Sequence, residues 1–349
     1  MSTEADLTLP GRVVVTGGLG FVGSHLCRSL LGDGHEVVAV DDASTGCLDN
    51  VADLLSNPLF RLVRASVMDP GVMDEAMAGA AVVFHLAAAV GVRLIVDDPL
   101  RTIETNIAGT KAVLDAALGR PVRVVVASTS EVYGKSDRFP WAEDDDIVLG
   151  PTSVRRWNYA ASKMIDEFVA LGYHRQHDLD TVVVRLFNVV GPRQTGQYGM
   201  VVPRFVRAAL DGEPLPVHGD GTQRRCFLHV HDAVDAFRRL GACDGAVGEV
   251  VNIGATEEVS ILELAGRILD AVGRPEGRSA DGAEGRTVFV PYEVAFDASF
   301  EDIPRRVPSI EKIHRLTGWA PVRTLEQIID DVIADQRSQT ELRLARAAG

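Results

Sequence analysis

Short runs of β-branched residues alternate with longer amphipathic stretches through the first half of the chain. The runs are continuously apolar, which is typical of strands that are buried on both faces of a parallel sheet. We therefore expect an α/β fold with a doubly wound parallel Rossmann sheet and right-handed crossover connections. The predicted strands are Arg12–Val15, Glu36–Val40, Val82–Phe84, Val122–Ala127 and Thr181–Val184.

The pattern changes after about Asn188 into shorter mixed elements that are rich in glycine, proline and arginine. Open α/β sheets bind their ligands at the carboxyl ends of the strands, so this second region is placed to cover a substrate there. We expect a dinucleotide-binding domain over residues 1–188, with a return near 225–250. A smaller, interlaced substrate-binding domain is expected over 189–349.

Acidic residues outnumber basic ones by 49 to 35, which gives the chain a formal net charge of −14. A field of that sign repels phosphate backbones and anionic lipid, so we expect neither nucleic acid nor membrane as a partner. No apolar run approaches the roughly 18 residues that span a bilayer, and residues 1–10 lack the order of a signal peptide. The cysteines are widely spaced and predict neither a disulfide framework nor a zinc site, so we expect a cytoplasmic protein.

A glycine-rich segment, GGLGFVG, lies between the first predicted strand and the first predicted helix. Its glycines Gly17, Gly20 and Gly23 read G-x-x-G-x-x-G. Such glycines allow a tight turn, a close approach of the backbone to a pyrophosphate, and close packing of helix on strand. The helix that follows offers free N–H groups to phosphates, and Phe21 and Val22 lie in its first turn.

The second predicted strand ends in Asp41 and Asp42, about twenty residues after the glycines. A carboxylate at this position accepts hydrogen bonds from both hydroxyls of an adenosine ribose and repels a 2′-phosphate. No arginine stands beside it, so the sequence favours NAD over NADP. The expected ribose ligand is Asp41.

A second group of polar residues follows the strand that ends near Ala127. Thr129 lies at the carboxyl edge of the sheet, while Tyr159 and Lys163, four residues apart in YAASK, share one face of a helix. A neighbouring cation favours the phenolate, so we expect a lowered pKa for Tyr159. Tyr159 is then a candidate general base toward a substrate hydroxyl, with Thr129 as its hydrogen-bond partner.

These motifs resemble the extended short-chain dehydrogenase/reductases that act on nucleotide sugars, and the resemblance runs from Val13 to about Pro321. It implies that Thr129, Tyr159 and Lys163 oxidise the C4 hydroxyl of a sugar, and that NAD stays tightly bound and is recycled. Because Tyr159 and Lys163 are both present, an enzyme is favoured over a non-catalytic NAD-binding protein. The motifs are TGGLGFVG, VVAVDD, FHLAA, TNIAGT, STSEVYG, YAASK, RLFNVVGPR and RRCFLHVHD.

The two residues after Thr129 indicate which members of the family the chain resembles most. Dehydratases of the dTDP-glucose type carry Asp-Glu there and simple 4-epimerases usually lack the glutamate, whereas UDP-glucuronate decarboxylases have Thr-Ser-Glu. This chain has Ser130 and Glu131. The sequence therefore resembles a UDP-glucuronate decarboxylase, with a UDP-glucuronate or UDP-glucose 4-epimerase as the alternative and a nucleotide-sugar 4,6-dehydratase behind it.

Decarboxylation fits these residues chemically. Oxidation at C4 turns the carboxylate on C5 of UDP-glucuronate into a β-keto acid, which loses carbon dioxide through an enolate. On this interpretation Ser130 hydrogen-bonds the carboxyl group, and Glu131 steers or destabilises it. Arg225 is a cationic contact or part of a proton relay, or equally the clamp on the pyrophosphate that the resemblance implies. The product is UDP-xylose or UDP-4-keto-pentose, and no motif says whether the ketone is reduced before release.

The resemblance also implies contacts around the two ligands. Asn188 resembles a residue that contacts the nucleotide-sugar phosphate, while Arg185 and Arg306 contact substrate or hold the two domains together. Relatives usually carry an acidic residue for the adenine amine where Ser66 lies, so Ser66 departs from the pattern. The remaining expected ligands are Val67, Leu86, Ala87, Ala88 and Asn106 for NAD, and Val202 for the UDP-sugar.

His229, His231 and Asp232 could be mistaken for a metal cluster. A strand that runs into a helix capped by Asp232 explains them better, so we expect no metal. The resemblance further implies a homodimer, in which the helices near 106–118 and 159–163 pack as a bundle.

Overall fold

The computed structural model describes residues 9, 11–89, 98–196, 200–273, 286–295 and 301–348 of the 349-residue chain. Within these ranges, no helix combines the length and the apolar character that crossing a membrane requires. All four cysteines are free thiols.

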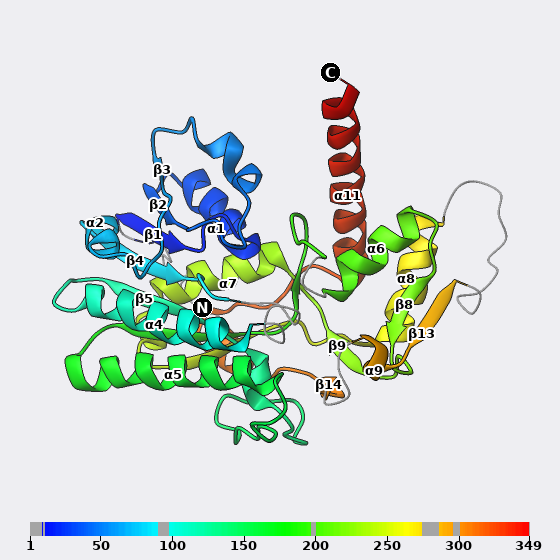
Figure 1. The fold of residues 1–349 in the computed structure, drawn as a ribbon. Coiled ribbons are helices and arrows are strands. Elements are labelled where there is room, and N and C mark those ends of the chain that lie inside the picture. Colours follow the sequence, from blue (N-terminus) through cyan, green and yellow to red (C-terminus); the bar gives the residue numbers. More distant parts are fainter. Residues whose placement is uncertain are drawn as a thin grey trace.

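A seven-stranded parallel sheet occupies the centre of the described chain (Figure 1). The strands lie in the order β3–β2–β1–β4–β5–β6–β11, which is the doubly wound order extended by one strand. The predicted fold class is therefore confirmed. Every predicted strand is present, and β3 and β11 were missed because each is four residues long and interrupted by a polar residue. The strands are β1 (Arg12–Thr16), β2 (Val37–Val40), β3 (Phe60–Val63), β4 (Ala80–His85), β5 (Arg123–Thr129), β6 (Thr181–Leu186) and β11 (Val250–Ile253).

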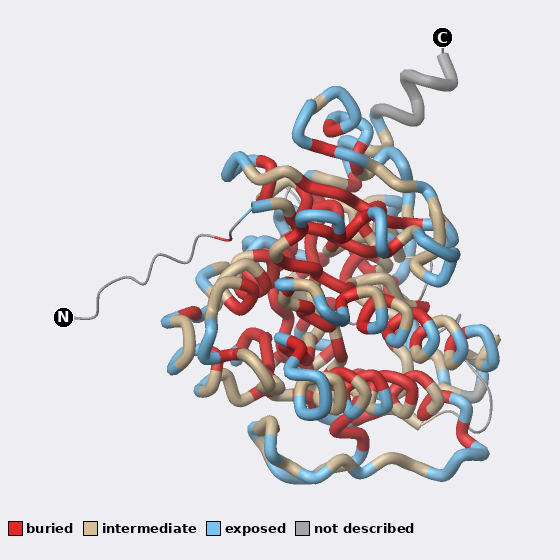
Figure 2. The backbone as a smooth tube through the Cα atoms, turned by 90° about the vertical axis from the view of Figure 1, so that its left-hand side faces the viewer, coloured by how far each residue is buried: buried red, intermediate tan, exposed pale blue. Residues whose placement is uncertain are grey.

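Successive residues of each strand face opposite sides of this sheet, and helices cover both sides. Val13 and Val15 of β1 pack toward α1 (Phe21–Gly32) and α7 (Val230–Ala242). Val14 packs on the other side, in a core shared with α2 (Val72–Ala76), α4 (Pro99–Ala117) and α5 (Trp157–His177). Figure 2 shows buried backbone concentrated through the middle of the molecule. Burial on two faces explains why the strands read as continuous apolar runs.

The chain leaves this sheet after β6 and returns to it later. Helix α7 packs on α1, and β11 pairs with β6, which places Val250 beside Val183 and Ile253 beside Leu186. The return therefore runs over about 230–253, slightly later than the 225–250 that the sequence suggested. The division into two domains near residue 188 stays a proposal.

The second region has an apolar core of its own, formed by α6 (Val201–Leu210), β8 (Leu215–His218), α8 (Ile261–Val272) and the first half of α11 (Leu325–Ala348). Helix α8 begins at a capping box between Ser260 and Glu263. In Figure 1 the end of α11 projects away from the body. Three small sheets complete the region: β12 (Glu258–Ser260), β9 (Arg224–Cys226) and β14 (Arg305–Arg306); β13 (Thr287–Val290) with β8; and β10 (Leu228–His229) with β7 (Val189–Val190).

The remaining short elements connect these layers. They are the 3-10 helices η1 (Leu48–Leu54), η2 (Ser130–Tyr133) and η3 (Asp244–Ala246), and the helices α9 (Tyr292–Ala295) and α10 (Glu311–Thr317).

Candidate active site

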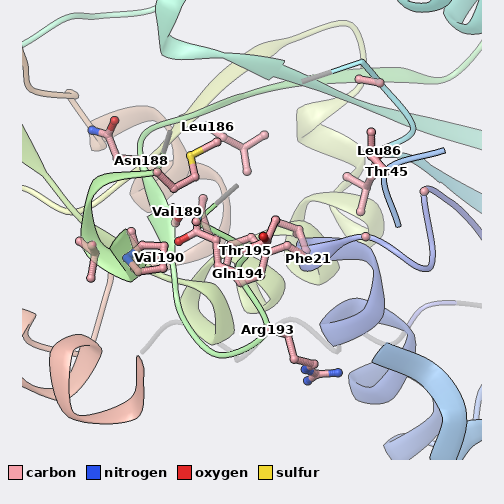
Figure 3. A pocket seen from close by; sticks show the side chains of 18 of the residues that line it. Phe21, Thr45, Leu86, Leu186, Asn188, Val189, Val190, Arg193, Gln194 and Thr195 are labelled. Carbon is pink, nitrogen blue, oxygen red and sulfur yellow. Dashed lines mark hydrogen bonds between the residues drawn. The ribbon is translucent and has the colours of Figure 1, made fainter. Parts of the chain in front are cut away.

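A cavity of about 1570 Å³ lies between the carboxyl edge of the central sheet and the second region. Its lining comes from the start of α1, from the segments that follow β2, β4, β5 and β6, and from α6, β8 and β9. Figure 3 shows Thr45 and Leu86 on one side, with Leu186 and Asn188 opposite. The sheet edge and the second region thus enclose one space. That a substrate binds in it stays a prediction.

The glycine-rich segment forms a close-packed turn at one end of this cavity. Gly17 has a φ of +71°, and a Cβ there would lie 2.8 Å from the backbone nitrogen of Ala87. A Cβ on Gly23 would lie 2.1 Å from the carbonyl oxygen of Gly17. Gly20 is the N-cap of α1 and brings no side chain to the first turn. The free N–H groups of that turn, where Phe21 and Val22 also line the cavity, suit an anionic ligand.

Asp41 lies at the end of β2 and holds this turn. Its Oδ2 accepts a hydrogen bond of 2.9 Å from the Leu19 N–H, and its Oδ1 accepts one of 2.8 Å from the Ala43 N–H. Burial raises the pKa of Asp41, although both backbone hydrogen bonds oppose that rise. Each oxygen keeps a further lone pair, so the carboxylate is able to accept hydroxyl groups. Its role as the ribose ligand stays a prediction.

Ser66 and Val67 also line this part of the cavity, as do Leu86, Ala87 and Ala88. The Ser66 hydroxyl accepts a hydrogen bond of 3.2 Å from the Met68 N–H, which leaves its proton free for another acceptor. We call these residues, together with Gly17–Gly23 and Asp41, the glycine-loop end of the cavity.

Asn106 differs from the other expected NAD ligands because it does not line the cavity. Its Oδ1 accepts a hydrogen bond of 2.8 Å from the Ala89 N–H, and its Nδ2 donates one of 3.0 Å to the Ser162 hydroxyl. The side chain is buried. It therefore ties the segment after β4 to α5, and its contact with NAD stays a prediction.

Thr129, Tyr159 and Lys163 come together where β5 meets α5, and all three line the cavity. Thr129 forms a hydrogen bond with Tyr159, and its Oγ1 accepts another of 3.2 Å from the Glu131 N–H. Lys163 and Tyr159 are both buried. The Lys163 Nζ donates to Asp166 Oδ2 over 2.8 Å.

The expected lowering of the Tyr159 pKa is wrong for the protein without its ligands. Burial raises that pKa well above its usual range, and the charges of Glu131 and Asp166 raise it further. The hydrogen bond from Thr129 and the charge of Arg306 oppose the rise without cancelling it. The Lys163 ammonium is paired with Asp166, so its charge toward the phenol is largely offset.

Three arginines and two carboxylates meet at the opposite end of the cavity. Arg306 Nη1 lies 3.3 Å from Glu131 Oε1, and Arg156 Nη2 lies 3.7 Å from the same oxygen. The two guanidinium groups outweigh burial and lower the pKa of Glu131. Glu131 is therefore an ionised, buried carboxylate, and the buried Ser130 beside it also lines the cavity.

Asp302 completes this cluster. Both oxygens of Asp302 lie 3.1 Å from Arg225 Nη2, and its Oδ1 lies 3.6 Å from Arg156 Nη1. Strand β14 pairs with β9 so that Arg306 lies opposite Arg225. Burial lowers the pKa of Arg225 to about 10. We call Glu131, Arg156, Arg225, Asp302 and Arg306 the arginine end.

Of the other expected substrate ligands, two line the cavity and one does not. Asn188 and Val202 line the cavity, and Asn188 Nδ2 donates to the Cys226 carbonyl over 2.9 Å. Arg185 does not line it. Its guanidinium pairs with Glu167, with Nη2 lying 2.7 Å from Oε2, and lies 4.7 Å from the centre of the Tyr133 ring. The structure therefore favours a packing role for Arg185 over the expected substrate contact.

The histidines near α7 have structural partners. His229 is the N-cap of α7 and accepts a hydrogen bond of 3.0 Å from the His231 N–H, so the helix is not capped by Asp232 as expected. Asp232 instead accepts hydrogen bonds from the backbone of Val322 and Arg323. Over the described ranges, no group of three or more His, Cys, Asp or Glu residues is arranged to hold a metal.

Sequence reasoning assigned no role to Arg156 or Asp302. Arg156 stands three residues before Tyr159 and directly precedes α5, and that helical spacing was the available signal. Asp302 carries no comparable signal, because it reaches Arg225 and Arg156 only through the tertiary fold.

The model of the family described as "NAD dependent epimerase/dehydratase family" matches residues 13–254 of this chain. A UDP-N-acetyl-alpha-D-glucosaminuronate decarboxylase from Bacillus cytotoxicus is 41% identical over 324 residues, which are 92% of this chain and 96% of the relative. UDP-glucuronic acid decarboxylase 1 from Xenopus tropicalis is 34% identical over 331 residues, which are 95% of this chain and 73% of that relative.

The fold of this chain is also similar to that of solved structures. A UDP-glucuronic acid 4-epimerase from Bacillus cereus, solved with UDP-glucuronic acid and NAD, superposes with a TM-score of 0.81. The two sequences are 26% identical, and the match covers 94% of this chain and 99% of the other. Proteins with different reactions therefore share this architecture, so the reaction has to be argued from the site.

Proposed function

The chain belongs to the NAD dependent epimerase/dehydratase family, and from that premise we propose that it is an NAD-dependent decarboxylase of a UDP-linked uronic acid, UDP-glucuronate. The observation that carries the proposal is the juxtaposition of Glu131, Arg306 and Arg156 with Tyr159 around one cavity. Oxidation at C4 uses Thr129, Tyr159 and Lys163 with NAD, and it does not require a second buried carboxylate. A buried, arginine-paired carboxylate beside it suits a reaction that must also handle a substrate carboxylate.

The residues of the glycine-loop end fit NAD. The turn at Gly17 and Gly23 leaves no room for a Cβ, so only a bare backbone allows a pyrophosphate to approach the first turn of α1. Asp41 offers acceptors for ribose hydroxyls, and Lys163 keeps donors beyond its bond to Asp166. When bound, NAD supplies the acceptor for the hydride that leaves C4.

In the oxidation step, the Tyr159 phenolate accepts the proton of the C4 hydroxyl while the hydride leaves C4. Thr129 holds the phenol by its hydrogen bond, and Lys163 supplies positive charge nearby. A pKa raised by burial makes the phenolate a strong base once it forms. The step leaves a ketone at C4.

In the decarboxylation step, the bond between C5 and the carboxyl carbon breaks and its electron pair moves into the enolate of the C4 ketone. The Ser130 hydroxyl orients the leaving carboxylate, and the ionised Glu131 disfavours that carboxylate in the ground state. Arg306 and Arg156 balance the charge of Glu131. Protonation of C5 completes the step, with Arg225 as relay or as pyrophosphate clamp. The product is UDP-4-keto-pentose, or UDP-xylose if the hydride returns.

Product mass tests the proposal against the 4-epimerase alternative. We expect UDP-glucuronate, incubated with the protein and NAD, to lose the mass of carbon dioxide. An isomer of unchanged mass would contradict decarboxylation, and a dehydratase would instead remove water. In Glu131→Ala, we expect oxidation to survive better than carbon dioxide release, and full-rate release would remove Glu131 from the mechanism.

A second substrate is favoured by one observation. The Bacillus cytotoxicus relative, at 41% identity, is named for UDP-N-acetylglucosaminuronate. That molecule undergoes the same C4 oxidation and carboxylate loss, and differs by an acetamido group on C2. The ratio of kcat/KM for the two UDP-uronates, measured in parallel, decides which is the substrate.

We further propose that the enzyme is a cytoplasmic homodimer. Helices α4 and α5 lie against each other and expose apolar side chains, Leu100 at 72% and Phe168 at 67%. The dimer proposal requires that the apolar side chains of these two helices form one contiguous patch, as protein interfaces do. Light scattering that gives only the monomer mass would contradict the dimer. The free cysteines support a reducing compartment.

A further inference from the structure

Helix α5 carries a buried ion pair in which the proposed chemistry uses Lys163 but gives Asp166 no role. Lys163 Nζ lies 2.8 Å from Asp166 Oδ2, one helical turn further on. The Lys163 side chain is 3% exposed and that of Asp166 is fully buried. Burying two charges costs their hydration, so a pair in such a position requires an explanation.

The groups around Tyr159, Lys163 and Asp166 come from five other elements. Tyr159 faces Glu131 of η2 and Arg306 of β14, and it is hydrogen-bonded to Thr129 at the end of β5. Lys163 faces His85 of β4, whose pKa is lowered to about 3 by burial and by the lysine, so that this imidazole is neutral. Asp166 is influenced by Thr110 of α4 and by Glu167 beside it. Asp166 is therefore the anion in direct contact with the lysine.

We propose that Asp166 is a positioning residue for the Tyr159–Lys163 pair, a fixed counter-ion that holds the Lys163 ammonium in place and offsets its charge toward the phenol. The inference deepens the proposed function and rests on it, since it assumes that Tyr159 is the base.

The bonds of the pair support this role. An ammonium has three N–H donors, and Asp166 takes one, which fixes the direction of the other two. Besides the Lys163 ammonium, Thr110 of α4 is a side-chain hydrogen-bond partner of the buried Asp166 carboxylate. Thr110 is uncharged, so Lys163 is the partner that balances the charge of the carboxylate. The charge of Asp166 is thus balanced by Lys163, while its bond to Thr110 ties α5 to α4.

The charge of Asp166 has a defined effect on the base. It raises the pKa of Tyr159, in the same direction as Glu131 does. Neutralising Asp166 leaves the Lys163 cation unopposed, which favours the phenolate and lowers that pKa. The Tyr159 hydroxyl then loses its proton at a lower pH.

Asp166→Asn tests the proposal because it removes the charge and keeps the shape. In the NAD-saturated full chain, the near-ultraviolet absorbance of tyrosinate reports phenol ionisation, and Tyr159→Phe identifies the contribution of that residue. We expect the ionisation and the acid limb of kcat/KM to move together to lower pH by about one unit. Asp166→Glu restores the charge and should restore most of the wild-type profile. An unmoved or upward-shifted ionisation would overturn the proposal.

Glu167→Gln is the matched control. Glu167 is the next residue of α5 and is also buried, but its partner is Arg185, with Nη2 lying 2.7 Å from Oε2. Its loss should lower the Tm as much as Asp166→Asn does, without moving the Tyr159 ionisation. If the Tyr159 ionisation shifts equally in both variants, the shift comes from a general disturbance of α5, and the proposal is overturned.

The experiments distinguish a failure of the Asp166 proposal from a failure of the proposed decarboxylase function. The tyrosinate titration needs no substrate, so a shift in Asp166→Asn supports the counter-ion even if no UDP-uronate is decarboxylated. Should Asp166→Asn not fold, Asp166→Ser removes the same charge with less bulk and is titrated in the same way.

Discussion

The glycine-loop end and the arginine end of the cavity are held by different kinds of contact. At the glycine-loop end, backbone N–H groups bond to carbonyls and to Asp41, and glycines allow the chain to pack on itself. At the arginine end, five charged side chains from separate segments compensate one another. The structure of the glycine-loop end therefore depends on shape, and that of the arginine end depends on charge balance.

This difference separates binding from chemistry. A packed backbone turn tolerates little change in volume, so substitutions there affect folding and the binding of NAD together. A cluster of three cations and two anions carries one net positive charge, which a substrate carboxylate would neutralise. Substitutions there should affect turnover of the acidic sugar more than they affect the fold.

Arg306→Met is the substitution with the largest expected effect at the arginine end. It leaves Glu131 with Arg156, 3.7 Å away, as its remaining arginine partner, so the pKa of Glu131 rises and the cluster loses its surplus charge. We expect kcat/KM for the UDP-uronate to fall roughly a thousand-fold, about 4 kcal/mol, because a preorganised cation is lost. Steady-state kinetics and NAD titration measure the change, with NAD affinity nearly unaltered.

Arg305→Met is its control. Arg305 is the other residue of β14, but its side chain is 45% exposed and pairs with Glu258 over 2.7 Å, away from Glu131. We expect less than a three-fold change, since exposed pairs contribute about 0–1 kcal/mol. A comparable loss in both variants would mean that β14 matters for folding only.

At the glycine-loop end, Gly23→Ala should disrupt folding and NAD binding together. Its Cβ would lie 2.1 Å from the Gly17 carbonyl oxygen, so the backbone has to move. We expect a loss of about 3 kcal/mol in the free energy of unfolding, measured by urea denaturation. Gly32→Ala, in the same helix, meets nothing within 4 Å and should stabilise by up to about 1 kcal/mol. Normal NAD affinity in Gly23→Ala would contradict the close packing.

Acid should weaken the attachment of helix α1. His25 of α1 donates from Nε2 to the Pro192 carbonyl, and burial lowers its pKa to about 4. Between pH 6.5 and 4 the unfolded chain binds this proton more readily, so stability is lost as the pH falls and is unaffected above that window. At pH 5 the loss is about 2 kcal/mol. The carboxyl groups of Glu131 and Asp302, with lowered pKa values, keep their stabilisation to lower pH.

Tm measured against pH tests this order of events. His25→Gln should lower the Tm at neutral pH and reduce the slope of its dependence between pH 6.5 and 5, to which the buried His85 and the half-buried His218 also contribute. A dependence as steep as that of the parent protein would assign the acid sensitivity to other groups.

The two ends also differed in how far the sequence predicted them. The glycine-loop end is encoded in consecutive residues and in one strand end about twenty residues later, and most of its expected residues line the cavity. Tyr159 and Lys163 were predictable for the same reason, since helical spacing is a local rule. A motif gives proximity to the site and does not say which side chain reaches it, as the buried Asn106 illustrates.

The arginine end was predictable only in part. Glu131 and Arg306 are 175 positions apart, and the two-residue strand β14 that brings Arg306 opposite Arg225 has no hydrophobic pattern. For Arg185, in contrast, the sequence suggested a role in the site and the structure shows a structural ion pair. An arginine at a strand end suggested a substrate contact, whereas Glu167, eighteen positions earlier on α5, binds it inside the fold. Charge pairing across the fold is not readable from spacing.

Ser66→Asp is the substitution with the smallest expected effect. It adds a charge to the glycine-loop end and so tests whether that end depends on shape alone. Relatives usually carry an acidic residue there, and a carboxylate keeps the bond from the Met68 N–H while offering a second acceptor to the adenine amine. We expect a gain of about 1 kcal/mol, roughly five-fold in NAD affinity by calorimetry. Ser66→Asn, with one acceptor and no charge, should gain less, and Ser66→Ala should lose affinity. If Ser66→Asp binds NAD no better than the parent protein, adenine is recognised elsewhere, and this end depends on shape alone.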